Sequence, residues 1–305
     1  MSMKKRMLAM IMLVVMSIVC LAGCGSSKEG ESGSGTSGDV SSGTTDTGDV
    51  SPTLEKLRKS GTIRIAGSGT APFGYKDSDT DEIKGIDMEI SIAVAKKLGI
   101  DHVEYIVTTF DNLIAALQAG KCDAISSAMY ITDERKKVIN FSNVYYKEGE
   151  GILFAQEKEY KSLEDMKGAV CAIEQGSGYA DVAKKYKKQG IFKRIDTYPS
   201  IDETVLALKS DKADVAMADN VALAYIGSQD ANKSANLTLL DPYEMLYAGD
   251  IGAGFTKDDP AFVEEWNEAL KELKEDGTVL SIMKKYGLDE TFYVEPGEDV
   301  TENIE

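Results

Sequence analysis

The stretch Ile114-Ala115-Ala116-Leu117-Gln118-Ala119-Gly120-Lys121-Cys122-Asp123-Ala124 decides the fold, because its pattern returns 91 residues later. The second copy is Val205-Leu206-Ala207-Leu208-Lys209-Ser210-Asp211-Lys212-Ala213-Asp214-Val215. In both copies a run with helical apolar spacing ends in a turn and leads into a short apolar strand. The repeat predicts two similar α/β lobes.

A second repeat precedes the first. Leu54-Glu55, Lys59 and Gly61, followed by a strand ending at Gly67-Ser68-Gly69, correspond to Leu163-Glu164, Lys167 and Gly168, followed by a strand ending at Gly176-Ser177-Gly178. Each lobe therefore begins with a helical turn, a strand and a glycine loop. Open α/β sheets bind ligands at the carboxyl ends of their strands. We expect the ligand between the two lobes.

The two ends of the chain differ from its middle. Residues 1–23 combine a basic start with a short apolar run, which is typical of a secretory signal peptide. Leu21-Ala22-Gly23-Cys24 resembles the bacterial lipobox, which implies acylation of Cys24, with palmitate among the acyl groups, and anchoring at the extracytoplasmic face of the cell membrane. Residues 24–51 are rich in Gly, Ser and Thr and are predicted to be a flexible linker. Residues 291–305 are predicted to be an acidic tail.

Composition excludes several classes of function. The formal net charge is -17, which argues against a nucleic-acid partner because phosphate binding needs a basic surface. His102 is the only histidine, and we expect it in a surface turn before a strand. Cys122 and Cys171 fall in different lobes, and we expect buried free thiols. No metal site and no cofactor is predicted.

Arg135 and Asp219 follow equivalent strands of the two lobes, predicted at Ala124 to Ser127 and at Val215 to Met217. An arginine can bind a carboxylate in bidentate fashion and an aspartate can accept hydrogen bonds from an ammonium group, so together they match an α-amino acid. Two alternatives remain open. Arg135 could pair with a neighbouring acid on the surface, and Asp219 could cap the helix that follows.

Helix signals complete the predicted topology. A helix should open at Gly85-Ile86-Asp87, with Asp87 as its N-cap, and another should follow Phe110-Asp111. Two last helices, near Phe262 to Leu273 and Val279 to Tyr286, should pack on the first lobe, with Trp266 as a packing residue.

Several ordered motifs carry a family resemblance. The chain resembles the family 3 extracellular solute-binding proteins, the polar amino acid receptors of ABC importers, over about Thr53 to Leu288. The motifs are Gly85-Ile86-Asp87, Phe110-Asp111-Asn112-Leu113-Ile114, Gly120-Lys121-Cys122-Asp123-Ala124-Ile125, Ile131-Thr132-Asp133-Glu134-Arg135 and Phe141-Ser142-Asn143-Val144-Tyr145-Tyr146.

The resemblance implies an α/β fold of the two-lobe, periplasmic-binding-protein-like type II. Lobe 1 would comprise residues 52–147 plus 249–290, and lobe 2 would comprise residues 148–248. Two crossing strands, near Tyr146 to Gly151 and Ala248 to Gly252, would form the hinge between them.

The resemblance also assigns roles in the ligand site. Arg135 would hold the α-carboxylate and Asp219 the α-ammonium group. Phe110 would stack on the ligand, while Ser127 and Tyr130 would contact it. Ser177 and Gly178 would supply backbone amides from lobe 2.

Two positions depart from the family pattern or extend it. Tyr130 lies where the family usually has Ser or Thr. A tyrosine at this position also resembles receptors for ectoine-type solutes. With Phe73 and Phe110 it could form an aromatic wall for a cationic or ring-shaped ligand. Glu174 could face the cleft and select the side chain, or could be a solvated strand end.

The leading hypothesis is a monomeric, non-enzymatic, lipid-anchored receptor that delivers an amino acid to an ABC permease. ATP hydrolysis would belong to a separate subunit, because no GxxxxGK[ST] loop is present. The ligand is predicted to be polar, with cationic and cyclic amino acids left open. One alternative is a dehydratase on the same scaffold with Glu174 as proton donor. Another is an amino-acid-sensing protein, although sensory receptors of this kind need a membrane span after the lobes.

Overall fold

A computed structural model describes residues 50–229 and 236–297, within a compact unit that spans Thr47–Glu305. The predicted signal peptide, Cys24 and nearly all of the predicted linker lie outside the described residues, as does the predicted tail beyond residue 297. Within the described ranges, no helix is long and apolar enough to cross a membrane.

The first sheet has five strands in the order β4-β1-β5-β13-β6. Strand β1 pairs in parallel with β4 and β5, whereas β13 is antiparallel to β5 and β6. Short strands β2 and β3 form a separate hairpin. The strand bounds are β1 Thr62–Gly67, β2 Tyr75–Lys76, β3 Ile83–Lys84, β4 His102–Val107, β5 Ala124–Ile125, β6 Asn140–Phe141 and β13 Gly254–Phe255.

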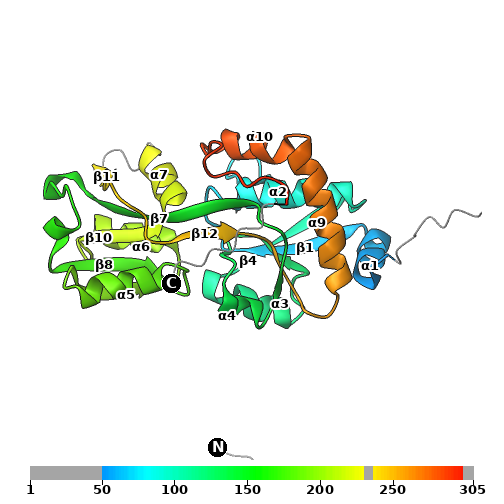
Figure 1. Cartoon of the computed structure of the whole chain (residues 1–305), viewed down its shortest axis with the longest axis horizontal. Helices are drawn as coiled ribbons and strands as arrows, with labels where there is room; N and C mark the ends of the chain where they lie inside the picture. The colour runs from blue at the N-terminus through cyan, green and yellow to red at the C-terminus, as the bar shows by residue number, and fades with distance from the viewer. Residues whose placement is uncertain (1–49, 230–235, 298–305) are drawn as a thin grey trace, which may run out of the picture. The chain divides into compact units, whose positions relative to one another are not determined.

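Helices from both ends of the chain belong to this first region (Figure 1). Helix α9 contacts α1, α2 and α10, so the last helices pack on the first lobe as predicted. The bounds are α1 Pro52–Ser60, α2 Ile86–Lys97, η1 Phe110–Asn112, α3 Leu113–Gln118, α4 Asp133–Lys136, α9 Pro260–Glu275 and α10 Thr278–Lys285.

The second sheet has the order β11-β7-β10-β8-β9, with β12 also paired to β7. Strands β8, β9 and β10 run parallel, and β7 is antiparallel to β10. The bounds are β7 Tyr146–Ala155, β8 Ala169–Glu174, β9 Phe192–Tyr198, β10 Val215–Asp219, β11 Leu237–Leu239, β12 Ala248–Ile251, η2 Gln156–Lys158, η3 Glu164–Met166, α5 Ala180–Lys188, α6 Ile201–Lys209 and α7 Asn220–Ser228.

The two sequence repeats correspond to equivalent parts of the two sheets. Helix α3 leads into β5, and helix α6 leads into β10. Strand β1 lies beside β5 in the first sheet, and β8 lies beside β10 in the second. The α/β fold with two similar sheets is therefore confirmed.

Strands β7 and β12 connect the two sheets (Figure 1). They pair with each other in antiparallel register, from Ala248 opposite Gly149 to Ile251 opposite Tyr146. These are the two segments in which the sequence predicts hinge strands.

Trp266 and the two cysteines are core residues. The Trp266 side chain is fully buried and its Nε1 donates to the Tyr145 hydroxyl at 3.0 Å. Cys122 and Cys171 are buried free thiols, as expected, and burial raises the pKa of the Cys122 thiol to about 11. His102 is exposed but is the first residue of β4 rather than part of the preceding turn.

Three predictions need correction. Asp87 is not the N-cap of α2, because Gly85 occupies that position and Asp87 is buried inside the first turn. Ser51, assigned to the linker, is the N-cap of α1, where its Oγ accepts from Leu54 N at 2.9 Å. Tyr293 and Val294, assigned to the tail, belong to the fold, because Val294 is buried and Tyr293 pairs with Tyr146.

Candidate functional site

A small, narrow cavity lies where strands β1, β5, β8 and β10 end. Residues from both sheets line it, as expected for the carboxyl ends of strands in α/β proteins. Eight of the nine predicted ligand-binding residues are among them. The lining residues are Ser68, Thr70, Phe73, Phe110, Ser127, Ala128, Tyr130, Glu174, Ser177, Gly178, Tyr179, Ile201 and Asp219.

Arg135, the ninth predicted residue, lies in α4 beside this cavity. Its Nη1 donates to the Tyr130 carbonyl at 2.8 Å, and its Nη2 donates to the Gly176 carbonyl of the other sheet at 3.0 Å. The guanidinium carbon is 5.4 Å from the centre of the Phe110 ring. Among the described residues Asp133 pairs with Lys136 instead, so the alternative of a surface ion pair for Arg135 is not what the structure has.

Asp219 is the last residue of β10 and occupies the N-cap position of α7. Its side chain makes no capping hydrogen bond, and its Oδ1 is buried without a partner of ordinary hydrogen-bond geometry among the described residues. Burial raises the pKa of Asp219 to about 6, against the opposing effect of nearby Tyr130. The alternative in which Asp219 caps the helix is therefore wrong for this structure.

Glu174 ends strand β8 and is 3% exposed. Its Oε1 is also buried without a hydrogen-bond partner among the described residues. Burial raises the pKa of Glu174 well above its ordinary value, and the neighbouring Asp219 adds to this effect. Glu174 faces the cavity, so the alternative of a solvated strand end is wrong.

Tyr130 fits between two glycines. A Cβ at Gly249 would lie 2.4 Å from Tyr130 Cδ1, and a Cβ at Gly178 would lie 3.1 Å from Cδ2. The Tyr130 ring also contacts Tyr247, with 5.0 Å between the ring centres. Glycine on both sides leaves room for a ring where the family usually has a smaller side chain.

The Asp87 side chain holds a residue of the cavity lining in place through a hydrogen bond, a role that the sequence analysis missed. Its Oδ1 accepts from Ala128 N at 2.9 Å, and its Oδ2 accepts from the Tyr146 hydroxyl at 2.7 Å. Ala128 lines the cavity with φ +46°, a left-handed conformation that is unfavourable for alanine and is held here by this hydrogen bond. Burial raises the pKa of Asp87 to about 7. The sequence analysis missed this role because Asp87 lies at the predicted start of a helix, where an aspartate is expected to be the N-cap.

Thr70, Tyr179 and Ile201 are further lining residues that the sequence analysis missed. Tyr179 immediately follows the second glycine loop, so its position next to Gly178 was the available signal. Thr70 follows the first glycine loop in the same way. Nothing in the sequence marks Ile201, which enters the cavity from the start of α6.

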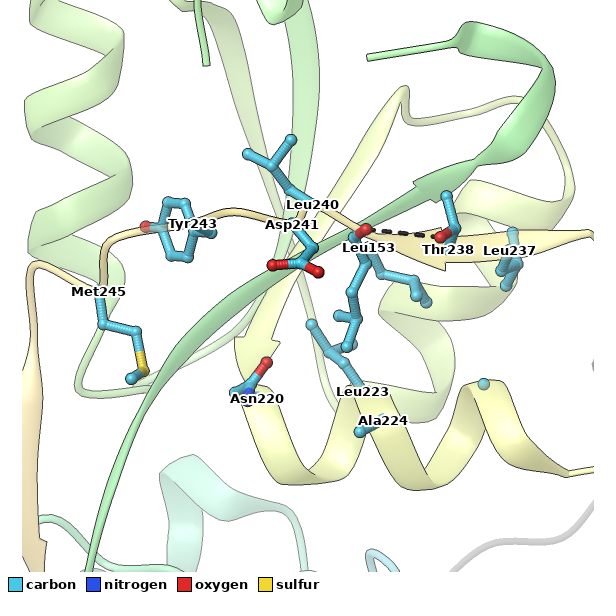
Figure 2. Close-up of a pocket in the computed structure, with 12 residues that line it drawn as sticks. Leu153, Asn220, Leu223, Ala224, Leu237, Thr238, Leu240, Asp241, Tyr243 and Met245 are labelled. Carbon is cyan, nitrogen blue, oxygen red and sulfur yellow. Dashed lines mark hydrogen bonds between the residues drawn. The ribbon is translucent and has the colours of Figure 1, made fainter. Parts of the chain in front are cut away.

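A wider pocket of about 600 Å³ lies on the second sheet (Figure 2). It lies between helix α7, which contributes Leu223 and Ala224, and the segment from Leu237 to Met245. Among the described residues of its lining, Asp241 is charged and none is Arg or Lys.

A metal centre has no support in the described part of the chain, where no group of three or more His, Cys, Asp or Glu could hold an ion. Among the described residues, the site instead combines one guanidinium group with two buried carboxyl groups and four aromatic rings. This is an arrangement for binding a small polar ligand.

Comparison with known families decides the classification. Residues 63–289 match the model of the bacterial extracellular solute-binding proteins, family 3. The chain belongs to this family. The resemblance stated from the motifs is thus confirmed, while the lipoprotein form stays a prediction.

Individual relatives of this family 3 protein bind amino acids, according to their names. The ABC transporter glutamine-binding protein GlnH of Bacillus subtilis is 28% identical over 287 residues, covering 92% of this chain and 97% of that protein. The arginine-binding extracellular protein ArtP of the same organism is 32% identical, covering 70% and 81%. These relatives are binding proteins rather than enzymes, as expected for this chain.

Solved structures agree with the fold. An ancestral arginine-binding protein bound to arginine is 34% identical, with a TM-score of 0.66, covering 75% of this chain and 99% of that one. The two-lobe, periplasmic-binding-protein-like type II fold is therefore confirmed.

Proposed function

We propose that this protein captures an α-amino acid with a cationic side chain outside the cell and delivers it to an ABC importer. Arg135 holds the α-carboxylate, Asp219 holds the α-ammonium group, and Glu174 accepts the cationic end of the side chain. Ser177 and Gly178 add backbone amides, and Phe110 covers the ligand.

The observation that carries the proposal is the charge balance of the cavity. Asp219 and Glu174 are both buried, and each has a carboxylate oxygen without a hydrogen-bond partner among the described residues. In the described part of the chain, Arg135 is the guanidinium group beside them. A zwitterion with an additional positive charge matches one guanidinium and two carboxylates. Buried charges require such partners, because an unpaired charge away from water is strongly unfavourable.

The aromatic rings of the cavity lining favour the same class of ligand. Phe73, Phe110 and Tyr130 contribute ring faces, and ring faces attract cations.

The transport context comes from the relatives. The GlnH relative is named for an ABC transporter, and the ArtP relative is named as extracellular. We therefore assign to this chain a permease and a separate ATPase as partners. We further propose that the protein acts as a monomer. Acylation of Cys24, with residues 24–51 as tether, would hold the protein at the extracytoplasmic face of the cell membrane.

The test is a thermal-shift screen of the purified protein after unfolding and refolding to remove bound ligand. The panel contains arginine, lysine, ornithine, histidine, glutamine, cystine and ectoine. A ligand that binds only the folded state raises the unfolding midpoint. We expect the largest shift with arginine, lysine or ornithine, and loss of that shift in Arg135→Ala and Asp219→Ala.

A neighbouring substitution serves as the control. Lys136→Ala removes a positive charge one residue from Arg135 but leaves the cavity lining intact, so it should retain the full shift. A shift with ectoine but with no amino acid would contradict the proposed ligand class. An unchanged shift in Arg135→Ala would contradict the assigned role of this residue.

A further inference from the structure

Glu148 lies on strand β7, outside the cavity lining, and is 1% exposed. Its Oε1 accepts a hydrogen bond from Val221 N at 2.9 Å. Val221 is the second residue of α7, and its N–H is one of the donors that an N-cap side chain ordinarily satisfies. A glutamate from a hinge strand therefore caps the helix that begins beside the ligand site.

Strand register brings Glu148 to this place. Strand β10 pairs with β7 so that Asp219 lies opposite Glu150 and Ala218 opposite Gly151. Continuing this antiparallel register by two residues places residue 148 opposite residue 221. Gly151 permits the close approach, because a Cβ there would lie 2.8 Å from Asn220 Oδ1.

Asp219 occupies the N-cap position itself, and aspartate is among the residues preferred there. An aspartate that caps a helix turns its carboxylate onto the backbone of the first turn. That conformation would withdraw the carboxylate from the cavity. In this structure the capping bond is already made by Glu148, and Asp219 lines the cavity instead.

We propose that Glu148 is a positioning residue that caps α7 in place of Asp219 and so leaves the Asp219 carboxylate free for the α-ammonium group of the ligand. This inference rests on the proposed function, because it requires Asp219 to bind the ligand.

The charges around Glu148 fit a capping role rather than a second ionic contact. Burial raises the pKa of Glu148 well above its ordinary value, and Asp219 of β10 and Asp87 of α2 add to this. Arg135 of α4 lowers the pKa of Asp219, and Glu150 of β7 raises it. A neutral Glu148 carboxyl can still accept from Val221 N without placing a second negative charge beside Asp219.

The test measures the dissociation constant for L-arginine by calorimetry in four variants. Glu148→Ala removes the acceptor, so the Asp219 carboxylate can cap α7 in the ligand-free protein. The ligand must then break this capping hydrogen bond in order to bind Asp219. We expect about fivefold weaker binding, the equivalent of one N-cap hydrogen bond. Glu148→Gln keeps an acceptor oxygen and the neutral charge, so it should bind within about twofold of the wild type.

A double-mutant cycle separates this role from general damage to the fold. In the Asp219→Ala background no carboxylate remains to be withdrawn, so adding Glu148→Ala should change the dissociation constant less than about twofold. A crystal structure of Glu148→Ala without ligand should have an Asp219 carboxylate oxygen within hydrogen-bond distance of Val221 N or Ala222 N.

Each contrary result has a defined meaning. Wild-type affinity in Glu148→Ala, an equal loss in Glu148→Gln, or an equal further loss in the Asp219→Ala background would overturn the positioning role. Wild-type affinity in Asp219→Ala would instead overturn the proposed function. The crystal structure of Glu148→Ala would then still show whether Asp219 caps α7 when Glu148 is removed.

Discussion

Glu174→Gln gives the sharpest test of ligand class, because it removes one negative charge from the cavity and keeps the shape of the side chain. Glu174 is 3% exposed at the end of β8, and its Oε1 has no hydrogen-bond partner among the described residues. A cationic ligand side chain would supply that partner.

The expected magnitude is that of one hydrogen bond between charged groups in a buried site. Such a bond contributes about 1.5–3 kcal/mol, which corresponds to about 12- to 140-fold in affinity. Solvent does not screen the interaction at this degree of burial. Glutamine as ligand carries no side-chain charge, so its affinity should change less than about threefold.

Calorimetric titration with L-arginine and L-glutamine measures both values on the same preparation. Glu203→Gln, an exposed substitution on helix α6 of the same lobe, is the matched control and should leave both affinities unchanged. Equal losses for the two ligands, or unchanged arginine affinity, would refute the assignment of Glu174 to the cationic side chain.

Three further predictions concern protons and packing. Burial raises the pKa of Glu174 and a bound cation favours its ionised form, so arginine binding should release a proton and should strengthen as pH rises toward that pKa. Titrations at about pH 8, where Asp219 with its pKa of about 6 is already ionised, in buffers of different ionisation enthalpy measure the proton. A proton released equally by Glu174→Gln at this pH would contradict Glu174 as its source. Gly249→Ala should lower the free energy of unfolding by about 1–3 kcal/mol, because the new Cβ would clash with the Tyr130 ring. In the control Gly227→Ala on α7, the new Cβ would have no atom within 4 Å and should not destabilise the protein. Urea unfolding measures both free energies, and equal stability of the two variants would contradict the tight fit at Gly249. Asp87 has a pKa of about 7 in the folded state and 3.8 ordinarily, so between these values the folded state binds a proton that the unfolded state does not. The free energy of unfolding of the wild type should therefore fall relative to that of Asp87→Asn as pH rises from about 4 to 8. Unfolding measurements at both pH values test this, and the same difference between the two proteins at pH 4 and pH 8 would refute it.

Strand ends were predictable from the sequence because apolar runs followed by glycine loops identify both the strand and the edge at which it ends. The repeat around Ile114 and Val205 therefore placed Ser127, Tyr130 and Asp219 at one end of their sheets, where the structure has them. Boundaries were less predictable. The strand expected from Ala124 to Ser127 is paired only over Ala124–Ile125, since pairing depends on the neighbouring strand.

Side-chain direction could not be read from spacing. Glu174 and Asp219 each had a solvated or capping alternative, because a residue at a strand end can turn toward solvent, toward a helix or into a cleft. Asp87 was wrongly predicted to cap α2 because a buried acid near a helix start has the same local pattern as an N-cap.

The sequence by itself determined that two α/β lobes share a repeated helix–turn–strand unit, because periodicity and glycine loops are local properties. It also predicted that Arg135 and Asp219 follow equivalent strands of the two lobes. Only the tertiary structure decided what each buried carboxyl contacts. Asp87 holds Ala128, Glu148 caps α7, and Asp219 is left facing the cavity. Those contacts join residues far apart in the chain, and only the register of strands brought together by folding determines them.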